Sequence, residues 1–577
     1  MKVSNTITAD GKSILKSEVF ENGSQKTVTS YTYNSDGTIA SQTVTPTVGE
    51  PLTTEFGYTY NPDGSFSITT TVNNVKDNDG SSKSVTTVQN YDWLGNLTSS
   101  VDAMGNTTVY WYDNLGRVIR QINPDETNKK IDYNVSDNSV TVTDENGYVT
   151  TKDYSPLGYM DKIYFDNDLN KLAAEYKYDN HGRKVSETAY QDIGGKAVKE
   201  NYTYDQFDRI KTQTSKEDDT VLDKINYQYS YGEGYQSLGE GINIVNVPSN
   251  AKKLTVLFYS KSSRNYDAAV QDDNSVYFTE KMTYGKTKGT VVDVTGLSQI
   301  RISAGYSGAY YKFLTDEETA QNINLLGGAS QTVTATYTGD ETYVKPTVET
   351  VLDGFGNKVS ETYYKHGTDT VLNKNTYKYD YAGNVTETLG GRTYMENLGS
   401  YTSKAEYNYM GKPTKVYQTD GSYVTAEYDD YGNALTSTDY EGNTTTVCYD
   451  ILGRAIACEA PFDETTTTKS LTYYDANGNV IKTKQQVTAS SYTETENEYD
   501  NRNRLVSVRI NDGERDIYTQ YAYDGAGNVV KMVTGQTSKI EDLYGTLPEE
   551  ATYQTYEYDR FGNVTKATDA LGQDVIS

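Results

Sequence analysis

Short runs of alternating apolar and polar residues, separated by turn residues, extend along most of this chain. Segments such as 384–388 (NVTET) and 563–566 (NVTK) show the pattern clearly. An alternation of period two predicts β-strands, because successive side chains of a strand point to opposite faces of its sheet. Val, Thr and Tyr fill many of these positions and are residues that strands favour. The pattern therefore predicts an all-β protein.

A tyrosine followed by Asp-x-x-Gly and then Asn or Arg recurs about seventeen times between these runs. The Asp side chain in such a cluster can accept a hydrogen bond from the backbone two residues on. The Gly supplies the left-handed conformation of a three-residue hairpin loop closed by a bulge. Each cluster therefore predicts the tip of a β-hairpin. The fullest copies are Tyr176-x-Tyr178-Asp179-x-x-Gly182-Arg183, Tyr377-x-Tyr379-Asp380-x-x-Gly383-Asn384, Tyr521-x-Tyr523-Asp524-x-x-Gly527-Asn528 and Tyr556-x-Tyr558-Asp559-x-x-Gly562-Asn563.

The spacing of these tyrosines indicates one continuous array. Steps of 21 residues join Tyr91, Tyr112, Tyr133 and Tyr154, and other steps lengthen to between 24 and 35. A period near 21 leaves about seven or eight residues for each strand after two turns, which is a normal strand length. A repeat of this kind predicts copies of one small unit stacked on one another.

With this motif recurring in register, the chain resembles the YD-repeat or Rhs-repeat family. That family includes bacterial polymorphic toxins, wall-associated proteins, shell components of insecticidal toxin complexes and the animal teneurins. The matching motifs cover roughly residues 31–229 and 350–577. The resemblance implies that the antiparallel hairpins spiral into a curved or hollow shell. In known members this shell encloses a cytotoxic or otherwise sequestered C-terminal segment.

The self-cleaving aspartate segment that ends the shell of toxin members is not found in this sequence. Ser577 closely follows one more turn, Asp569-Ala-Leu-Gly572, whose returning strand has barely begun. We therefore expect a fragment of a longer polypeptide, and we expect its partners to be the missing N- and C-terminal parts of that polypeptide.

The repeat is absent between residues 232 and 341, where short β-rich runs replace it. The sequence thus predicts a first array over 1–231, an inserted β-sandwich-like domain over 232–341 and a second array over 342–577. The Thr315-x-x-Glu318 capping box and Gly327 predict a short helix near 316–326. The predicted strands of the insert are 242–247, 254–259, 276–278, 290–294 and 299–303.

The insert also resembles jelly-roll modules of the carbohydrate-binding type, which stack exposed aromatic rings on sugar faces. Tyr259, Tyr284, Tyr306 and Tyr310 are the candidate ligand residues on this interpretation. Tyr accounts for 56 of the 577 residues, however, so such a cluster is more often packing or sheet surface than a platform for sugars. A spacer or lid domain is the alternative.

The charge balance excludes several partners. With 52 basic and 80 acidic residues the formal net charge is −28, which opposes binding to DNA, RNA or anionic lipid. Hydrophobic residues make up 35% of the chain, and that share includes the tyrosines, so Tyr must carry much of the packing. Neither a signal peptide at residues 1–10 nor a membrane-spanning apolar stretch is found, so we expect no membrane insertion by this segment. An extracellular or cell-surface location would need targeting residues upstream of Met1.

Two cysteines flank the turn that starts at Asp450. If Asp450 pairs with Arg454, Cys448 faces Ile456 and Cys458 faces Thr446, so the two sulfurs share a face but are diagonally offset. The sequence therefore predicts free thiols.

Candidates for catalysis are few. The chain has two histidines, His181 and His366, and both fall at turns without a nucleophile spaced to use them. Asp77-Asn-Asp79-Gly80 opens like a calcium loop but lacks the carboxylate at the twelfth position, so a solvated acidic turn is expected. A glycosidase-type carboxylate pair among the eighty acidic residues stays open. We expect no enzyme, no metal and no cofactor.

Three functional hypotheses remain, of which an enzyme is the least favoured. The first is a non-catalytic structural shell segment of a secreted or cell-surface protein, which encapsulates or displays a C-terminal effector domain absent from this chain. The second is an adhesin or carbohydrate-binding surface protein that acts through residues 232–341 or through Tyr-rich sheet surfaces and contacts a cell-surface glycan or protein.

Overall fold

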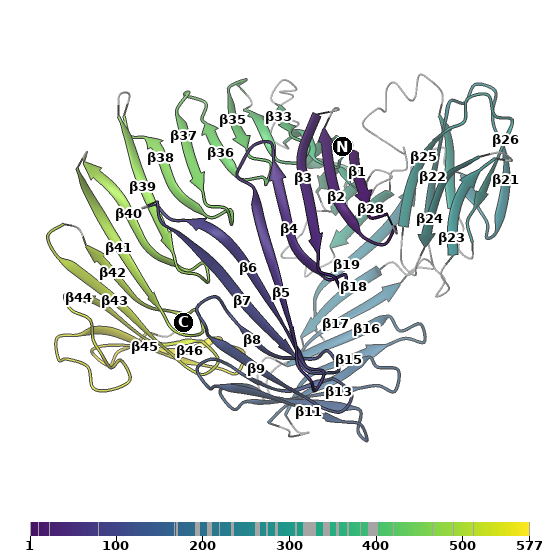
Figure 1. Ribbon diagram of the computed structural model, residues 1–577. Helices are drawn as coiled ribbons and strands as arrows, with labels where there is room; N and C mark the ends of the chain where they lie inside the picture. Colours follow the sequence, from purple (N-terminus) through teal and green to yellow (C-terminus); the bar gives the residue numbers. More distant parts are fainter. Residues whose placement is uncertain are drawn as a thin grey trace. The chain divides into compact units, whose positions relative to one another are not determined.

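The regular elements of the protein are β-strands throughout the described residues, as the sequence predicts (Figure 1). The computed structural model describes residues 2–575 apart from 10, 22–23, 79, 167, 169–170, 191–196, 205–209, 218–219, 232–235, 260–265, 273–274, 283–286, 306–308, 315–330, 338–346, 353–356, 366–367, 381, 391–401, 419, 464–465, 489 and 512. The helix expected near 316–326 lies outside the described residues.

The chain divides into two compact units, and the first comprises Met1–Pro156, Tyr164–Leu169 and Val424–Ser577. Its strands form two rows. The first row contains β1 (Lys2–Ile7), β2 (Ile14–Glu21), β3 (Ser24–Tyr33), β4 (Ile39–Pro46), β5 (Leu52–Tyr60), β6 (Phe66–Lys76), β7 (Ser82–Tyr91), β8 (Leu97–Val101), β9 (Thr107–Tyr112), β10 (Val118–Ile122), β11 (Asn128–Asn134), β12 (Ser139–Thr143) and β13 (Val149–Tyr154). The second row contains β35 (Tyr423–Tyr428), β36 (Ala434–Thr438), β37 (Thr444–Tyr449), β38 (Ala455–Pro461), β39 (Thr467–Tyr474), β40 (Val480–Thr488), β41 (Ser491–Tyr499), β42 (Leu505–Asn511), β43 (Asp516–Tyr523), β44 (Val529–Gln536), β45 (Thr552–Tyr558), β46 (Val564–Asp569) and β47 (Asp574–Val575).

Within each row every strand pairs antiparallel with the next strand along the chain. The register shifts at the tyrosine that precedes many of the turns. In the β7–β8 hairpin, for example, Asn90 faces Ser99 but Tyr91 faces Leu97. This shift is the bulge that closes a three-residue loop, so the predicted hairpin geometry is confirmed.

The second unit comprises Leu157–Ile163 and Asn170–Tyr423, and the strand β14 (Met160–Phe165) contributes residues to both units. Its array strands also pair in order from β15 to β19 and from β28 to β34. They are β15 (Leu172–Tyr178), β16 (Lys184–Tyr190), β17 (Ala197–Tyr204), β18 (Ile210–Glu217), β19 (Thr220–Tyr231), β28 (Gln331–Tyr337), β29 (Thr347–Leu352), β30 (Lys358–Tyr364), β31 (Val371–Tyr379), β32 (Val385–Leu389), β33 (Thr402–Tyr407) and β34 (Pro413–Tyr417).

The strands on either side of the insert are direct neighbours. β19 pairs antiparallel with β28, and Tyr231 at the end of β19 lies opposite Gln331 at the start of β28. The array sheet therefore takes in 331–337, which the sequence analysis assigned to the insert. The two ends of the insert leave and re-enter the sheet side by side, so the insert occupies the position of a hairpin loop.

The insert itself is a β-sandwich of two four-stranded antiparallel sheets. One sheet has the order β20-β27-β22-β25 and the other β21-β26-β23-β24. The strands are β20 (Gln236–Leu238), β21 (Ile242–Asn246), β22 (Lys253–Tyr259), β23 (Tyr266–Gln271), β24 (Val276–Met282), β25 (Thr287–Asp293), β26 (Gln299–Ser303) and β27 (Ala309–Leu314).

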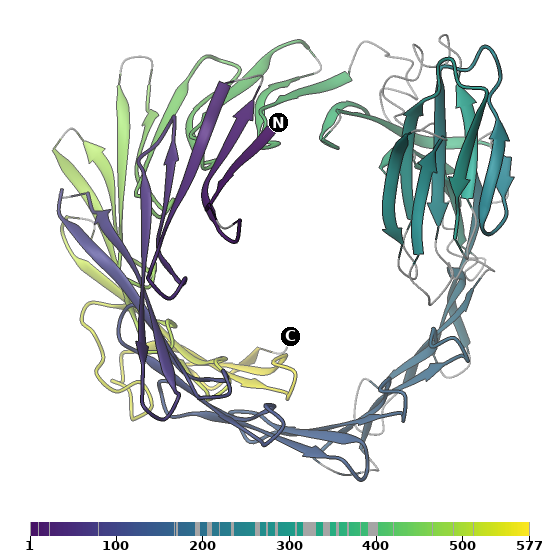
Figure 2. The ribbon, with the colours of Figure 1, turned by 45° about the vertical axis from the view of Figure 1, so that its right-hand side comes forward.

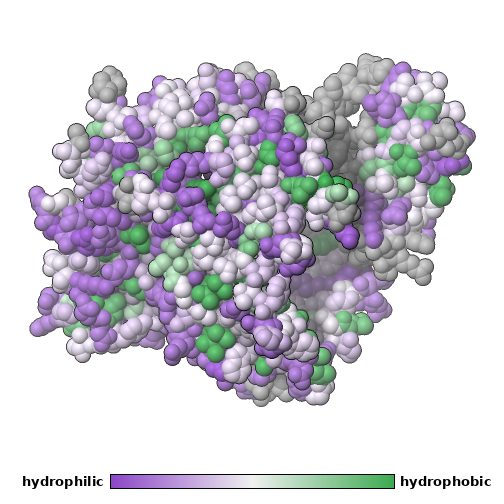
Figure 3. All heavy atoms as spheres, viewed as in Figure 1, coloured by the Kyte–Doolittle hydropathy of each residue, from purple (hydrophilic) through white to green (hydrophobic). Residues whose placement is uncertain are grey.

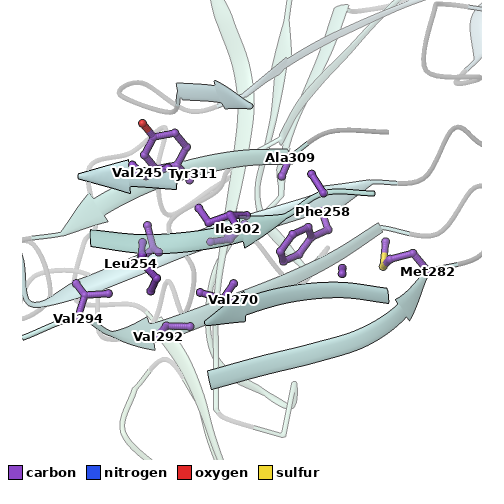
Figure 4. Packing of buried hydrophobic residues seen from close by; sticks show 14 of the residues in the cluster. Val245, Leu254, Phe258, Val270, Met282, Val292, Val294, Ile302, Ala309 and Tyr311 are labelled. Carbon is purple, nitrogen blue, oxygen red and sulfur yellow. The ribbon is translucent and has the colours of Figure 1, made fainter. Parts of the chain in front are cut away.

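The two sheets of the insert enclose an apolar core (Figure 4). Leu254, Val256 and Phe258 alternate along β22 and are fully buried, as the period of two requires. Ile300 and Ile302 of β26 face them from the other sheet. Sixteen buried residues belong to this cluster, so the insert has the conventional core that the array lacks.

Burial is sparse in the array. Outside the insert, the buried hydrophobic residues in the described part of the chain are Val75, Tyr164, Phe165, Ala174, Ala522, Val533 and Ala551. On the face shown in Figure 3, hydrophilic and intermediate residues cover most of the array and apolar residues occur singly or in small groups. The array is therefore held mainly by lateral pairing of backbone groups and by its turns.

The cysteines are free thiols, as predicted, but the predicted register was wrong. The bulge between Cys448 and Tyr449 places Cys448 opposite Ala457 and Cys458 opposite Val447. Because directly opposed residues share a face and neighbours along a strand do not, the two sulfurs point to opposite faces of the sheet.

Removal of the insert should leave the array folded. Because Tyr231 and Gln331 are paired, replacing residues 232–330 by Asn-Gly would convert β19 and β28 into an ordinary hairpin. We expect the shortened chain to keep a β-type circular dichroism spectrum and a cooperative urea transition. A broad, non-cooperative transition would show that the insert is needed to hold the two parts of the array together.

Candidate functional site

The recurring turn is fixed by its first aspartate. In the β7–β8 turn, Oδ1 of Asp92 accepts hydrogen bonds from the N–H groups of Leu94 (2.9 Å) and Asn96 (2.8 Å). Gly95 has φ +86° and donates its N–H to the carbonyl of Asp92. A side chain at this position would be strained, which explains the glycine of the motif.

The residue after the glycine completes the turn. Nδ2 of Asn96 donates to Oδ2 of Asp92 at 2.8 Å, so both carboxylate oxygens are used. This side-chain hydrogen bond lowers the pKa of Asp92 from its ordinary value, and Asn443 does the same for Asp439. Where Arg replaces Asn, as at Arg454, its guanidinium forms an ion pair of 2.6 Å with Asp450.

In many of the motifs the tyrosine joins its hairpin to the preceding one. Its hydroxyl donates to the backbone carbonyl at the start of the preceding returning strand. Where the preceding turn carries Arg, the guanidinium lies over this ring, as Arg117 does over Tyr133 at 4.1 Å. The hydroxyl contacts include Tyr112 to Leu97 (2.8 Å), Tyr449 to Ala434 (3.0 Å), Tyr474 to Ala455 (2.9 Å), Tyr499 to Val480 (3.0 Å), Tyr523 to Leu505 (2.7 Å) and Tyr558 to Val529 (2.8 Å).

A second set of contacts joins the two rows of the first unit (Figure 2). Turns of the first row, together with the end of β14, bind turns and strand ends of the second row that lie 373 to 394 positions further along the chain. We call these contacts the seam. At one end of the seam, Oδ2 of Asp430 accepts hydrogen bonds from the N–H groups of Thr47 and Val48, each at 2.8 Å.

Side-chain amides make a recurring contact in the seam. Asn477 donates to Oδ2 of Asp102 (2.7 Å) and accepts from the N–H of Met104 (3.2 Å). Asn146 binds Oδ2 of Asp524 (3.0 Å) and the N–H of Ala526 (3.1 Å) in the same way. In both cases an Asn at the third position of one turn recognises the first and third positions of the facing turn.

A charged cluster lies near the middle of the seam. Arg502 and Arg504 both donate to Oδ2 of Asp125, at 3.2 and 3.1 Å, and the three side chains are 17 to 20% exposed. Partial burial raises the pKa of Asp125, but hydrogen bonds from Thr127 and Arg502 outweigh it and leave that pKa below its ordinary value. The carboxylate therefore stays charged and holds the two rows together.

The backbones of the two rows also approach closely. A Cβ atom at Gly525 would lie 2.6 Å from the carbonyl oxygen of Glu145, so this position of the seam requires glycine. Beyond it, Arg560 pairs with Asp166 at 3.0 Å and lies over the ring of Phe165 at 4.1 Å.

A pocket of about 390 Å³ opens at one end of the seam, between the β4–β5 loop and the turns after β35 and β37. Asp429 and Asp450 line it. Their carboxylates already bind Asn433 and Arg454 of their own turns. These two carboxylates are therefore engaged in the turns that they cap.

The structure leaves the predicted glycan residues untested. Tyr259 ends β22 and Tyr310 lies in β27, but the placement of their side chains is not described, and Tyr284 and Tyr306 lie outside the described residues. The proposed sugar contact stays a prediction.

The other candidate residues fall in turns. His181 is exposed in the turn that Asp179 caps, and His366 lies outside the described residues. The acidic turn after β6 is not simply solvated as expected, because Asn78 donates to the carbonyls of Ile456 (2.6 Å) and Thr472 (2.8 Å) across the seam. Within the described ranges, no group of three His, Cys, Asp or Glu side chains could hold a metal ion, and no helix is long and apolar enough to cross a membrane.

Sequence reasoning missed the seam altogether. Its signal was present in the third position of the turns, where Asn146, Asn477 and Arg502 carry side chains that can bind a facing turn. That position is variable along the repeat, and nothing local indicates which turn it will face.

Comparison with known proteins identifies the repeat. The family model described as RHS Repeat matches residues 91–127 and 499–539. The tRNA3(Ser)-specific nuclease WapA of Bacillus spizizenii is 28% identical over 231 residues, which are 39% of this chain and 8% of the nuclease. This chain therefore corresponds to a small part of that relative.

Solved structures of TcdB2-TccC3 align over nearly the whole chain. The structure without the hypervariable C-terminal region has a TM-score of 0.42 and 11% identity, covering 98% of this chain and 34% of that one. A second TcdB2-TccC3 structure has a TM-score of 0.21 and 12% identity, covering 99% and 41%.

Breaking the charged cluster should weaken the seam. Arg502→Ala removes one partner of the half-buried Asp125, and we expect a loss of about 1–3 kcal/mol in the free energy of unfolding, measured with urea. Leu115→Ala is the matched control, because Leu115 occupies the same turn position but is 74% exposed and makes no seam contact among the described residues. Equal stability of the two variants would contradict this role of Arg502.

The lowered pKa values of the turn aspartates predict acid lability. The pKa of an aspartate in the unfolded chain is about 3.9. A carboxyl group whose pKa is lower than this in the folded chain adds to the free energy of unfolding at any pH above the unfolded pKa. This stability is lost as the pH falls through the folded pKa. We therefore expect the urea midpoint to be nearly constant from about pH 7 to 5 and to fall below about pH 4 as Asp92, Asp439 and Asp125 are protonated. A midpoint unchanged at about pH 3 would contradict the assignment.

Proposed function

Because this chain is a member of the YD/Rhs-repeat proteins, we propose that it is a non-catalytic wall segment of a container formed by such repeats. The wall would encapsulate or display an effector segment of the same polypeptide. This function needs a sheet that is stable without a filled interior and that extends by adding rows.

The seam is the observation that carries the proposal. A chain that binds itself edge to edge after 373 to 394 residues can lay one row of hairpins beside the last. Within each row the lateral pairing of successive strands leaves no free strand edge in the interior, which protects the wall from unwanted strand pairing. Rows fastened in this way support a continuous barrier.

The chemistry of the turns also supports a structural role. The carboxylates that recur along the chain bind the N–H groups, amides and guanidiniums of their own turns, as Asp92, Asp429 and Asp450 do. Acidic groups used in this way are occupied by the turns that they cap. The nuclease activity named for the WapA relative is not proposed for this chain.

The proposed location is outside the cell or on its surface. The formal net charge of −28 would keep an exposed array soluble and would repel nucleic acid. The effector and any cell-surface partner belong to the proposal and would be found by studying the full polypeptide.

Solution scattering tests the container directly. A solid globule of 577 residues has a radius of gyration of about 25 Å. A wall around an empty interior places its mass farther from the centre, so we expect a clearly larger radius and a pair-distance distribution skewed towards long distances. A radius near about 25 Å with a symmetric distribution would overturn the proposal.

A further inference from the structure

The turns of the first row alternate between its two edges, because the strands are antiparallel. The turns after β4, β6, β8, β10 and β12 contact the second row. The turns after β3, β5, β7 and β9 lie at the opposite edge, and among the described residues they make no hydrogen bond or ion pair with the second row. We call this the outer edge of the first row.

One turn of the outer edge is built like an occupied turn of the seam. In the turn Asn61-Pro62-Asp63-Gly64-Ser65, Ser65 donates to Oδ1 of Asp63 through both its N–H (3.0 Å) and its hydroxyl (2.7 Å). Asn61 donates in turn to the Ser65 hydroxyl at 2.9 Å.

The seam turn Asn123-Pro124-Asp125-Glu126-Thr127 has the same arrangement. Thr127 donates to Oδ1 of Asp125 through its N–H (3.2 Å) and its hydroxyl (2.5 Å), and Asn123 donates to the Thr127 hydroxyl at 3.1 Å. There, Oδ2 of Asp125 receives the guanidinium groups of Arg502 and Arg504. The equivalent oxygen of Asp63 is exposed and receives no described hydrogen bond.

A tryptophan of the neighbouring turn lies against the residue that follows Asp63. Trp93 is 71% exposed and lies against the turn, since a Cβ atom on Gly64 would be 3.1 Å from the Cβ of Trp93. Behind it, Phe66 stacks on Tyr91 with ring centroids 4.8 Å apart, which supports the neighbouring strand ends.

The seam shows what such a pair binds. Arg560 pairs with Asp166 at 3.0 Å while its guanidinium lies 4.1 Å from the centre of the Phe165 ring. The carboxylate pairs with the guanidinium while the ring contacts its planar face. This arrangement favours Arg over Lys, because only the guanidinium is planar.

We propose that Asp63 and Trp93 form a docking site for an arginine on a β-turn of a partner polypeptide segment. The site lies on the outer edge and extends the edge-to-edge recognition seen in the seam to a chain that is not part of this one. A second copy of this chain fits less well, because the outer-edge turns present Asp36, Asp63, Leu94 and Leu115 at their third position and no arginine there. The inference does not depend on the proposed container.

The tryptophan makes the site measurable. The chain contains two tryptophans, so Trp111→Phe leaves Trp93 as the only one. A backbone-cyclised peptide with the sequence of residues 497–507, which carries Arg502 and Arg504, is the probe. We expect a saturable change in Trp93 fluorescence, about tenfold weaker binding when Asp63→Asn removes the charge, and at least about threefold weaker binding by a peptide with both arginines replaced by lysine.

The controls separate docking from folding. Asp63→Asn keeps an oxygen that can accept the Ser65 hydrogen bonds, and an unchanged urea midpoint would show that the turn is intact. Asp420→Asn changes the aspartate of a similar turn, capped by Ser422, and should leave peptide binding unaltered. The proposal fails if the peptide gives no saturable change at millimolar concentration, if the lysine peptide binds equally well, or if Asp63→Asn binds as tightly as the parent.

Discussion

A sheet that is covered on neither face cannot be held by a hydrophobic core, and this constraint governs the array. Outside the insert only seven hydrophobic residues are buried in the described part of the chain, so the free energy of folding must come largely from lateral contacts. Backbone pairing supplies most of them, and the rest are local: an aspartate that saturates its own turn, a tyrosine hydroxyl that reaches the preceding hairpin, and a guanidinium that lies on the following ring. Each of these contacts contributes little to the free energy of folding, but their recurrence along the repeats makes the sum large.

The same constraint explains the composition. Tyrosine provides ring area for packing and a hydroxyl that must find a hydrogen-bond partner. It therefore suits a sheet whose side chains are only partly shielded from solvent. Asn and Arg both recur after the turn glycine because either can bind the second carboxylate oxygen. The insert is stabilised in a different way, by a buried core. It hides aliphatic and aromatic side chains between two sheets, and it joins the array through two adjacent strands, so either part can vary without disturbing the other.

Local chemistry made the array predictable, and distance made the seam unpredictable. The hairpin tips, the bulge and five insert strands follow from residues close in sequence, such as the alternating Leu254, Val256 and Phe258. The strands β20, β23 and β27 escaped notice because their patterns are short or interrupted. The cysteine register failed because the bulge predicted for the turn was not carried into the count of facing residues. No local pattern shows that Asn477 will meet Asp102, since the two residues lie 375 positions apart in the sequence.

The hydrogen bonds from tyrosine hydroxyls to the preceding hairpin have a consequence for biosynthesis. Many hairpins are joined to the one made just earlier, by contacts such as that from Tyr112 to Leu97, so the array can fold in the order in which the ribosome delivers it. The growing end then exposes one unpaired strand at a time. The partner row of the seam appears only after a further 373 to 394 residues, which at about 5–20 residues per second takes roughly 20–80 s. Through that interval the nascent first row must remain soluble alone, and its abundance of negative charge provides the means.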